Sequence, residues 1–165
     1  GGVWTQQGSK LVGTGAVGNA DQGYSVSLSA DGNTAMVGGD ADNGIAGAVW
    51  VWIRSGGVWT QQGSKLVGTG AVGSAGQGVF VSLSADGEAA IVGGYADNGG
   101  AGAAWFWTRS GGVWTQQGAK LVGTGAVGAS HQGEYVSLSG DGNTAIVGGW
   151  GDKYNAGAAW VFTRP

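Results

Sequence analysis

The side chains that could do chemistry are few in this sequence and stand far apart. His131 is the single histidine and there are no cysteines, so no second imidazole or thiolate is available for a zinc site or a catalytic triad. Asp31, Asp86 and Asp141 recur in Asp-Gly turns, and a lone carboxylate in a turn lacks the partner that acid–base catalysis needs. We therefore expect no catalytic residues, no cofactor and no enzyme activity.

One acidic segment is a weak candidate for a cation site. Asp40, Asp42 and Asn43 bring three oxygen-bearing side chains within four residues, and hard cations such as Ca²⁺ bind oxygen ligands. The segment recurs twice further along the chain, with Tyr95 in place of Asp40 in the second copy and Lys153 in place of Asn43 in the third. This difference favours a turn-stabilising role for the Asp and Asn side chains.

A threefold repeat must supply the elements that position these side chains. The string GGVWTQQGSKLVGTGAVG begins at Gly1 and at Gly56, and it returns with one change at Gly111. The repeats are 1–55, 56–110 and 111–165. A repeat that fills the chain predicts one repeat domain, 1–165, and so close an identity is typical of recent amplification or of an engineered sequence.

Each repeat has the pattern of four short β-strands. In the first full unit we expect strands at 24–29, 34–39, 48–54 and 58–62. The first alternates apolar residues with serines, whereas the third (AVWVWIR) is apolar on both faces and is therefore expected to be buried on both sides. Asp31-Gly32 predicts a hairpin with a primed turn, which needs positive φ. Helical spacing is almost absent, so the fold class is all-β.

Three architectures fit three four-stranded units: a β-propeller, a β-trefoil and a threefold β-prism. The order of the strands favours the propeller, because the sequence begins with the fourth strand of a unit, within 1–12, and ends with the third strand of a unit, at 158–164. The expected blades are 19–67, 74–122 and 129–164. The last blade lacks its outer strand unless an N-terminal segment supplies it.

The sequence also resembles a known repeat family. The segment QGYSVSLSADGNTAMVGGDADNGIAGAVWVWIRSGGVWTQQGSKL, with copies at Gln77 and Gln132, is similar to the bacterial FG-GAP type of repeat, a β-propeller blade related to those of integrin α-subunits. The resemblance implies a propeller and an extracellular location. The family's Phe-Gly is Gln-Gly here, and the connection 30–33 is too short for the six or more oxygen ligands of calcium.

Three blades predict association with copies of the same chain, because propellers usually close with about four to eight blades. The free strand at one end and the incomplete blade at the other are complementary, so copies can join head to tail. We expect a homodimer of six blades, with a homotrimer of nine blades as the alternative. A trefoil would be a monomer.

Differences between the repeats concentrate in two connections, before the first strand and between the second and third strands. Both lie at one end of a four-stranded meander, and a rigid scaffold with one variable loop face is typical of recognition. The candidate ligand-binding residues are Asp21, Tyr24, Asp40, Asp42, Tyr95, Asp97, His131, Glu134, Trp150, Asp152 and Tyr154. Neutral drift in exposed loops predicts the same pattern equally well.

Function therefore has one leading prediction and two alternatives. We expect a non-enzymatic, self-assembling propeller scaffold or binding module. Loop aromatics such as Trp150 and Tyr154 could instead stack on sugar rings in a carbohydrate-binding protein, or contact a peptide in a protein–protein interaction module. The tryptophans that recur in every repeat are predicted to be core. They are Trp4, Trp59 and Trp114, together with Trp50, Trp105 and Trp160.

Charge and composition argue against two classes of partner. The net charge is −3, with no cluster of Lys or Arg, so the electrostatic footprint of a nucleic-acid-binding protein is missing. Lys10, Lys65 and Lys120 are expected at solvated strand edges. No apolar run is long enough to predict a membrane span, and the absence of cysteine leaves the compartment undetermined.

Overall fold

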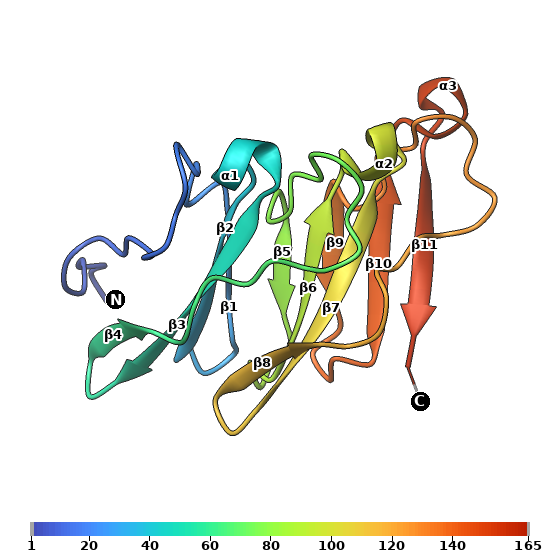
Figure 1. The fold of residues 1–165 in the computed structure, drawn as a ribbon. Helices are drawn as coiled ribbons and strands as arrows, with labels where there is room; N and C mark the ends of the chain where they lie inside the picture. Colours follow the sequence, from blue (N-terminus) through green and yellow to red (C-terminus); the bar gives the residue numbers. More distant parts are fainter. Residues whose placement is uncertain (1, 165) are drawn as a thin grey trace.

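The computed structural model describes residues 2–164 as three antiparallel β-sheets that stand side by side (Figure 1). The first sheet has the order β1 (Ser25–Leu28), β2 (Thr34–Gly39), β3 (Ala48–Ser55), β4 (Val58–Gln61). The second has the order β5 (Val81–Leu83), β6 (Ala89–Gly94), β7 (Ala103–Ser110), β8 (Val113–Gln116). The third has β9 (Tyr135–Leu138), β10 (Thr144–Gly149) and β11 (Ala158–Thr163). The all-β prediction is confirmed.

Asp-Gly turns close the hairpin between the first two strands of each sheet. In the first sheet, Asp31 Oδ1 accepts hydrogen bonds from the Ser29 hydroxyl and the Asn33 N–H, at 2.6 and 2.9 Å. Gly32 has a φ of 67°, but Asp31 is not among the described residues with positive φ. The predicted primed turn, which needs positive φ at both central residues, is therefore wrong, because the bonds made by the aspartate hold a different turn.

A single turn links the second and third strands of each sheet. These turns are α1 (Asp42–Ile45), α2 (Asp97–Gly100) and α3 (Asp152–Asn155). Their interiors are left-handed; Asn43 and Gly44, for example, have φ of 51° and 66°. No helix among the described residues is long and apolar enough to cross a membrane.

Buried aspartates tie the first two of these turns to the body. Asp42 accepts a hydrogen bond from the Val17 N–H at 2.8 Å and forms a salt bridge with Lys65. Asp97 and Lys120 repeat this salt bridge in the second sheet. The prediction that Lys65 and Lys120 are solvated edge residues is therefore wrong, since a buried carboxylate requires a partner.

The main core lies between the sheets and includes Trp105, whereas Trp50 packs in a separate cluster with Ala20 and Ala48. Trp50 and Trp105 are fully buried, which confirms the prediction for these two, whereas Trp4 is fully exposed and the prediction is wrong for it. A Cβ at Gly68 would lie 2.2 Å from Trp105 Cδ1, so glycine is required there for the chain to cross the indole ring. The Trp105 Nε1–H donates to the Thr69 carbonyl at 2.8 Å.

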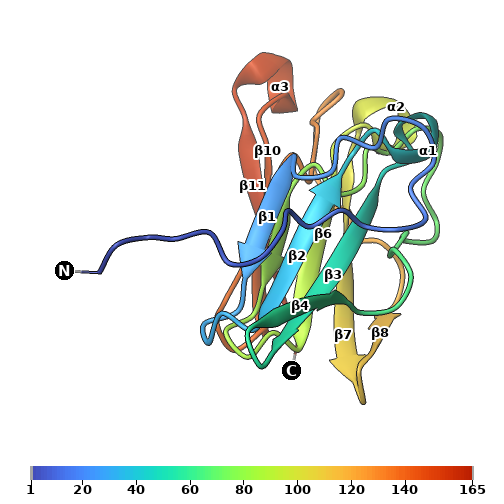
Figure 2. The same ribbon diagram turned by 90° about the vertical axis from the view of Figure 1, so that its left-hand side faces the viewer.

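From Gly2 onward, the N-terminal segment pairs with no strand among the described residues. From Gln7 onward it lies along the first sheet, where Gln7 Oε1 accepts a hydrogen bond from Trp59 Nε1–H at 3.2 Å. The residues before it extend away from the body (Figure 2), and Trp4 is 100% exposed. Within residues 2–164 the third sheet therefore remains three-stranded, and Gly1, the start of the predicted strand segment, lies outside the described residues.

Candidate functional site

Two sheet-to-sheet interfaces lie within the chain, and they bury residues at equivalent positions of successive repeats, which we call counterparts. The first interface, between the first and second sheets, contains Met36, Val51, Val81, Leu83 and Ala90. The second interface, between the second and third sheets, contains Ile91, Phe106, Val136, Leu138 and Ala145. The same positions thus form both interfaces.

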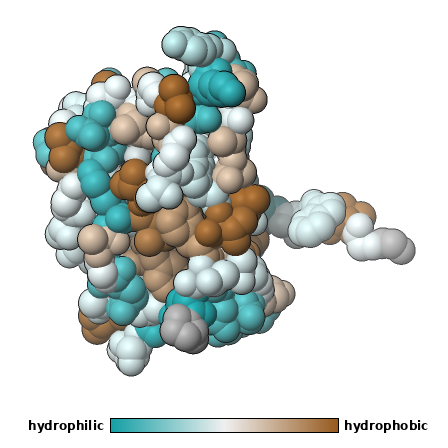
Figure 3. All heavy atoms as spheres, turned by 90° about the vertical axis from the view of Figure 1, so that its right-hand side faces the viewer, coloured by the Kyte–Doolittle hydropathy of each residue, from teal (hydrophilic) through white to brown (hydrophobic). Residues whose placement is uncertain are grey.

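At the two ends of the row of three sheets, the counterparts of these interface residues are exposed to solvent. Val26 on β1 is 69% exposed, whereas its counterpart Val81 is 5% exposed. At the other end, Ile146 on β10 is 45% exposed, whereas its counterpart Ile91 is 0% exposed. Leu28 and Val161 are exposed in the same way. Figure 3 shows apolar side chains gathered on the end formed by the third sheet.

Glycines on the second strand of each sheet let a neighbouring backbone approach closely. A Cβ at Gly38 would lie 2.0 Å from the Gly78 carbonyl oxygen, and one at Gly93 would lie 1.8 Å from that of Gly133. A Cβ at Gly148, the third counterpart, would meet nothing closer than 3.6 Å. The backbone of Gly148 is therefore uncovered at the end of the array.

Backbone hydrogen bonds across the internal interfaces repeat in the same way. Gly76 N–H donates to the Ile45 carbonyl at 2.8 Å, and its counterpart His131 N–H donates to the Gly100 carbonyl at 2.8 Å. The next counterparts are the Asp21 N–H and the Asn155 carbonyl, and no such bond joins them within the described chain. One end thus presents the donor and the other end the acceptor.

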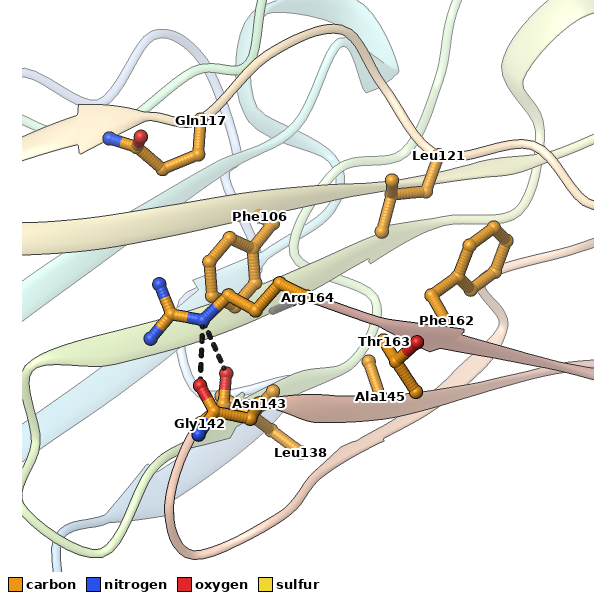
Figure 4. Close-up of a pocket in the computed structure, with 10 residues that line it drawn as sticks. All are labelled: Phe106, Gln117, Leu121, Leu138, Gly142, Asn143, Ala145, Phe162, Thr163 and Arg164. Carbon is orange, nitrogen blue, oxygen red and sulfur yellow. Dashed lines mark hydrogen bonds between the residues drawn. The ribbon is translucent and has the colours of Figure 1, made fainter.

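A cavity of about 330 Å³ opens beside β11, between the second and third sheets (Figure 4). It is lined by Phe106, Gln117, Leu121, Leu138, Gly142, Asn143, Ala145, Phe162, Thr163 and Arg164. The Arg164 guanidinium lies over the Phe106 ring, 5.0 Å from its centroid, and its Nε–H donates to the Gly142 carbonyl at 3.0 Å. The cavity is therefore an apolar chamber with a cation at its rim.

Several predicted ligand residues come together on the loop-bearing face. The His131 ring stacks on Trp150 with 5.1 Å between centroids and 12° between planes, and Tyr95 lies 6.1 Å from His131. The Trp150 Nε1–H donates a hydrogen bond to the Glu134 carboxylate. These four side chains form a cluster that bridges the second and third sheets.

Asp21 and Asp40 form a separate acidic pair on the first sheet. Burial raises the pKa of the Asp40 carboxyl, and the nearby Asp21 carboxylate adds to the shift. Asp40 Oδ1 is buried without a hydrogen-bond partner among the described residues. No group of three or more His, Asp or Glu side chains that could hold a metal ion occurs in the described part of the chain.

The remaining predicted ligand residues do not join either group. Asp42 and Asp97 are buried in their salt bridges, so their carboxylates are directed into the fold. Asp152 accepts a hydrogen bond from the Val127 N–H at 2.7 Å. Tyr24 and Tyr154 are exposed, the latter by 94%. The predicted ligand residues on the loop face therefore form two small, separate clusters.

Sequence reasoning did not single out the residues of the two open ends. Val26, Ile146 and Gly148 lie in sequence contexts similar to those of their buried counterparts, and the available signal was the order of strands at the two ends of the sequence. No protein-family model and no curated protein matches the chain. The likeness to FG-GAP repeats therefore depends on the sequence motifs alone.

Proposed function

We propose that the protein is a non-enzymatic scaffold that associates head to tail with copies of itself, forming a closed β-propeller in which each sheet is a blade. The observation that carries this proposal is the exposure of Val26 and Ile146 at the ends, where their counterparts Val81 and Ile91 are buried. Burial of apolar surface contributes roughly 25 cal/mol per Å², and exposed apolar patches mark interaction surfaces.

The two ends are different surfaces, so the contact between copies is heterologous. Such contacts form rings when the rotation closes and filaments when it does not. The internal interfaces indicate how two copies would meet. A third interface of the same kind would cover Val26 of one copy and Gly148 of the other. Two chains would give six blades, within the usual range of about four to eight, and three chains would give the nine-bladed alternative.

Native mass spectrometry of the full chain tests the proposal directly. We expect a dominant species with twice the 16.2 kDa mass of one chain, and a species of three times that mass would identify the nine-bladed alternative. A stable monomer at micromolar concentration, confirmed by sedimentation velocity, would contradict self-association.

Gly148→Ala is the sharpest variant for this test. The added Cβ meets nothing closer than 3.6 Å within the chain, so the fold should persist with an unchanged far-UV circular dichroism spectrum. Between copies it would meet a backbone, as a Cβ at Gly93 meets the Gly133 carbonyl oxygen at 1.8 Å. We expect this variant to be monomeric at concentrations at which the unaltered chain is expected to assemble.

The chain offers matched controls for Gly148→Ala. Gly140→Ala introduces, at the same end, the residue that the other repeats carry as Ala30 and Ala85, and it should leave assembly unchanged. Gly93→Ala should lower the melting temperature, because its Cβ would clash inside the chain. An assembled Gly148→Ala protein would show that this face does not meet a second copy.

A second candidate function is carbohydrate binding on the loop-bearing face. Trp150 is 49% exposed, and its Nε1–H is held by Glu134, which supports an oriented ring that a sugar could stack on. A glycan array tests this candidate, with Trp150→Ala as the variant that should lose binding. Absence of binding across the array would remove it.

A further inference from the structure

We infer that the cavity beside β11 is a peptide-acceptor site that binds Val3–Gln6 of a second copy as an added strand, with the Trp4 side chain as its anchor. This inference deepens the proposed self-association, because it names the segment and the side chain that the third sheet recognises. Addition of an extended segment to a free sheet edge is an established mode of peptide recognition.

The strand that fits this edge already occurs twice in the fold. The sequence Val-Trp-Thr-Gln forms β4 and β8 and recurs at Val3–Gln6, where it has no strand partner. β8 pairs with β7 in a register that sets Trp114 opposite Arg109 and Thr115 opposite Thr108. The same register on β11 sets Trp4 opposite Arg164.

The cavity has the lining that already holds a tryptophan elsewhere in the chain. Trp114 of β8 is 9% exposed and belongs to the apolar cluster of the first interface. That cluster includes Val51, Leu83, Ala90 and Trp107, with Leu66 packed against it. The cavity is lined by their counterparts Phe106, Leu138, Ala145, Phe162 and Leu121. An equivalent indole is the one component missing from it.

Two polar groups at the rim complete the match. In the first interface, Gln62 Oε1 accepts a hydrogen bond from Trp114 Nε1–H at 3.1 Å, and the Arg109 guanidinium lies 5.6 Å from the centroid of the Trp114 ring. Their counterparts at the cavity are Gln117 and Arg164, and both line it (Figure 4). Gln117 Oε1 has no donor among the described residues.

The chain's own Trp4 cannot reach this site. The N-terminal segment leaves the body beside the first sheet, and β11 lies at the opposite end of the array (Figure 1). Gln7 fixes that segment to the first sheet through its bond to Trp59. We therefore assign the donor strand to a second copy, which presents the same segment with Trp4 fully exposed.

A peptide-binding experiment on the full-length Trp4→Ala protein tests the inference. The probe is a fluorescently labelled peptide of residues 1–13, GGVWTQQGSKLVG, and the control peptide carries alanine in place of Trp4. Buried tryptophan anchors are typical hot spots of interfaces, so we expect the control peptide to bind at least about 30-fold more weakly in fluorescence anisotropy. Equal binding of the two peptides, or no binding, would overturn the inference.

Variants of residues that line the cavity provide a second, independent test. In the Trp4→Ala background, Gln117→Leu removes the indole acceptor from an exposed side chain and should weaken binding several-fold without loss of the fold. Ala145→Phe should fill the cavity and abolish binding; full affinity in both variants would contradict the assigned site. The native mass of the unaltered chain reports self-association separately, so the two proposals can fail independently.

Discussion

The Asp-Gly hairpins are small electrostatic units. Hydrogen bonds from the Ser29 hydroxyl and from Asn33 lower the pKa of Asp31 from its ordinary value of 3.8 to about 2. The corresponding serine hydroxyls lower the pKa of Asp86 and of Asp141 in the same way. Each turn therefore favours the charged form of its aspartate.

This pKa shift predicts a specific loss of stability in acid. A folded-state pKa below the unfolded value contributes stability that is present above about pH 4 and is lost as the pH falls towards about 2. We expect the urea midpoint of unfolding to fall over this range, and the fall to be smaller in the triple variant Asp31→Asn/Asp86→Asn/Asp141→Asn. If the urea midpoint fell by the same amount in both proteins as the pH is lowered, this role of the turns would be contradicted.

The turn α3 carries strain at its central position, where its counterparts have glycine. Lys153, Tyr154 and Asn155 have φ of 46°, 60° and 69°, and consecutive left-handed residues other than glycine are unfavourable. Gly44 and Gly99 occupy the position of Tyr154 in the other turns. The tyrosine side chain is exposed by 94%, so no internal packing compensates for the strain.

Tyr154→Gly should therefore stabilise the protein. Relief of the left-handed strain, less the entropy that glycine adds to the unfolded chain, is expected to contribute about 0.5 to 1 kcal/mol. Thermal unfolding followed by circular dichroism measures the effect. The reverse change, Gly99→Tyr, should lower the melting temperature, and an unchanged value for both variants would show that the turn is unstrained.

At the scale of elements, the first two one-turn connections are each held by a lysine from the segment that follows the sheet's outer strand. Lys65 pairs with Asp42 and Lys120 pairs with Asp97. Asp152 is the third aspartate, and the next counterpart lysine is Lys10 in the N-terminal segment. A copy that adds its N-terminal segment to the third sheet would bring Lys10 to α3.

A double-mutant cycle tests this contact between copies. Lys10→Met and Asp152→Asn should each weaken association about tenfold, since loss of one partner leaves a charge desolvated at the interface. The double variant should associate no more weakly than either single variant when the dissociation constants are compared by sedimentation equilibrium. Lys65→Met, which breaks a pair inside the chain, should lower stability while leaving association unchanged, and additive losses in the cycle would contradict the pairing.

At the scale of the whole molecule, the three sheets bury two interfaces and leave the apolar counterparts of these interfaces exposed at the two ends. Association would cover the exposed apolar ends and Trp4, which is fully exposed in the single chain. Stability should then depend on protein concentration, because a partner that binds only the folded chain stabilises it by mass action.

We therefore predict a concentration-dependent melting temperature. Hundredfold dilution of the unaltered chain should lower the melting temperature by several degrees, because a higher chain concentration favours the assembled state. The Gly148→Ala variant, expected to be monomeric, should melt at one temperature throughout the dilution series. A constant melting temperature for the unaltered chain, measured by differential scanning fluorimetry, would contradict stabilisation by association.

The sequence by itself determined the repeat, the all-β class and the approximate strand positions. The expected segments 34–39 and 48–54 nearly coincide with β2 (Thr34–Gly39) and β3 (Ala48–Ser55). The burial of Trp50 and Trp105 followed from the same patterns. Alternation and turn residues act over a few positions, so the local sequence is sufficient to encode them.

Only the tertiary structure decided which copies of a repeated residue are covered. Trp4 and Trp114 have the same neighbours in sequence, yet the first is 100% exposed and the second is 9% exposed. The pairing of Asp42 with Lys65 and the clustering of His131 with Trp150 were also absent from the local pattern. The physical reason is that burial and pairing depend on the sheet that stands next to a residue, and repeats of nearly the same sequence have that neighbour on one side, on both sides or not at all.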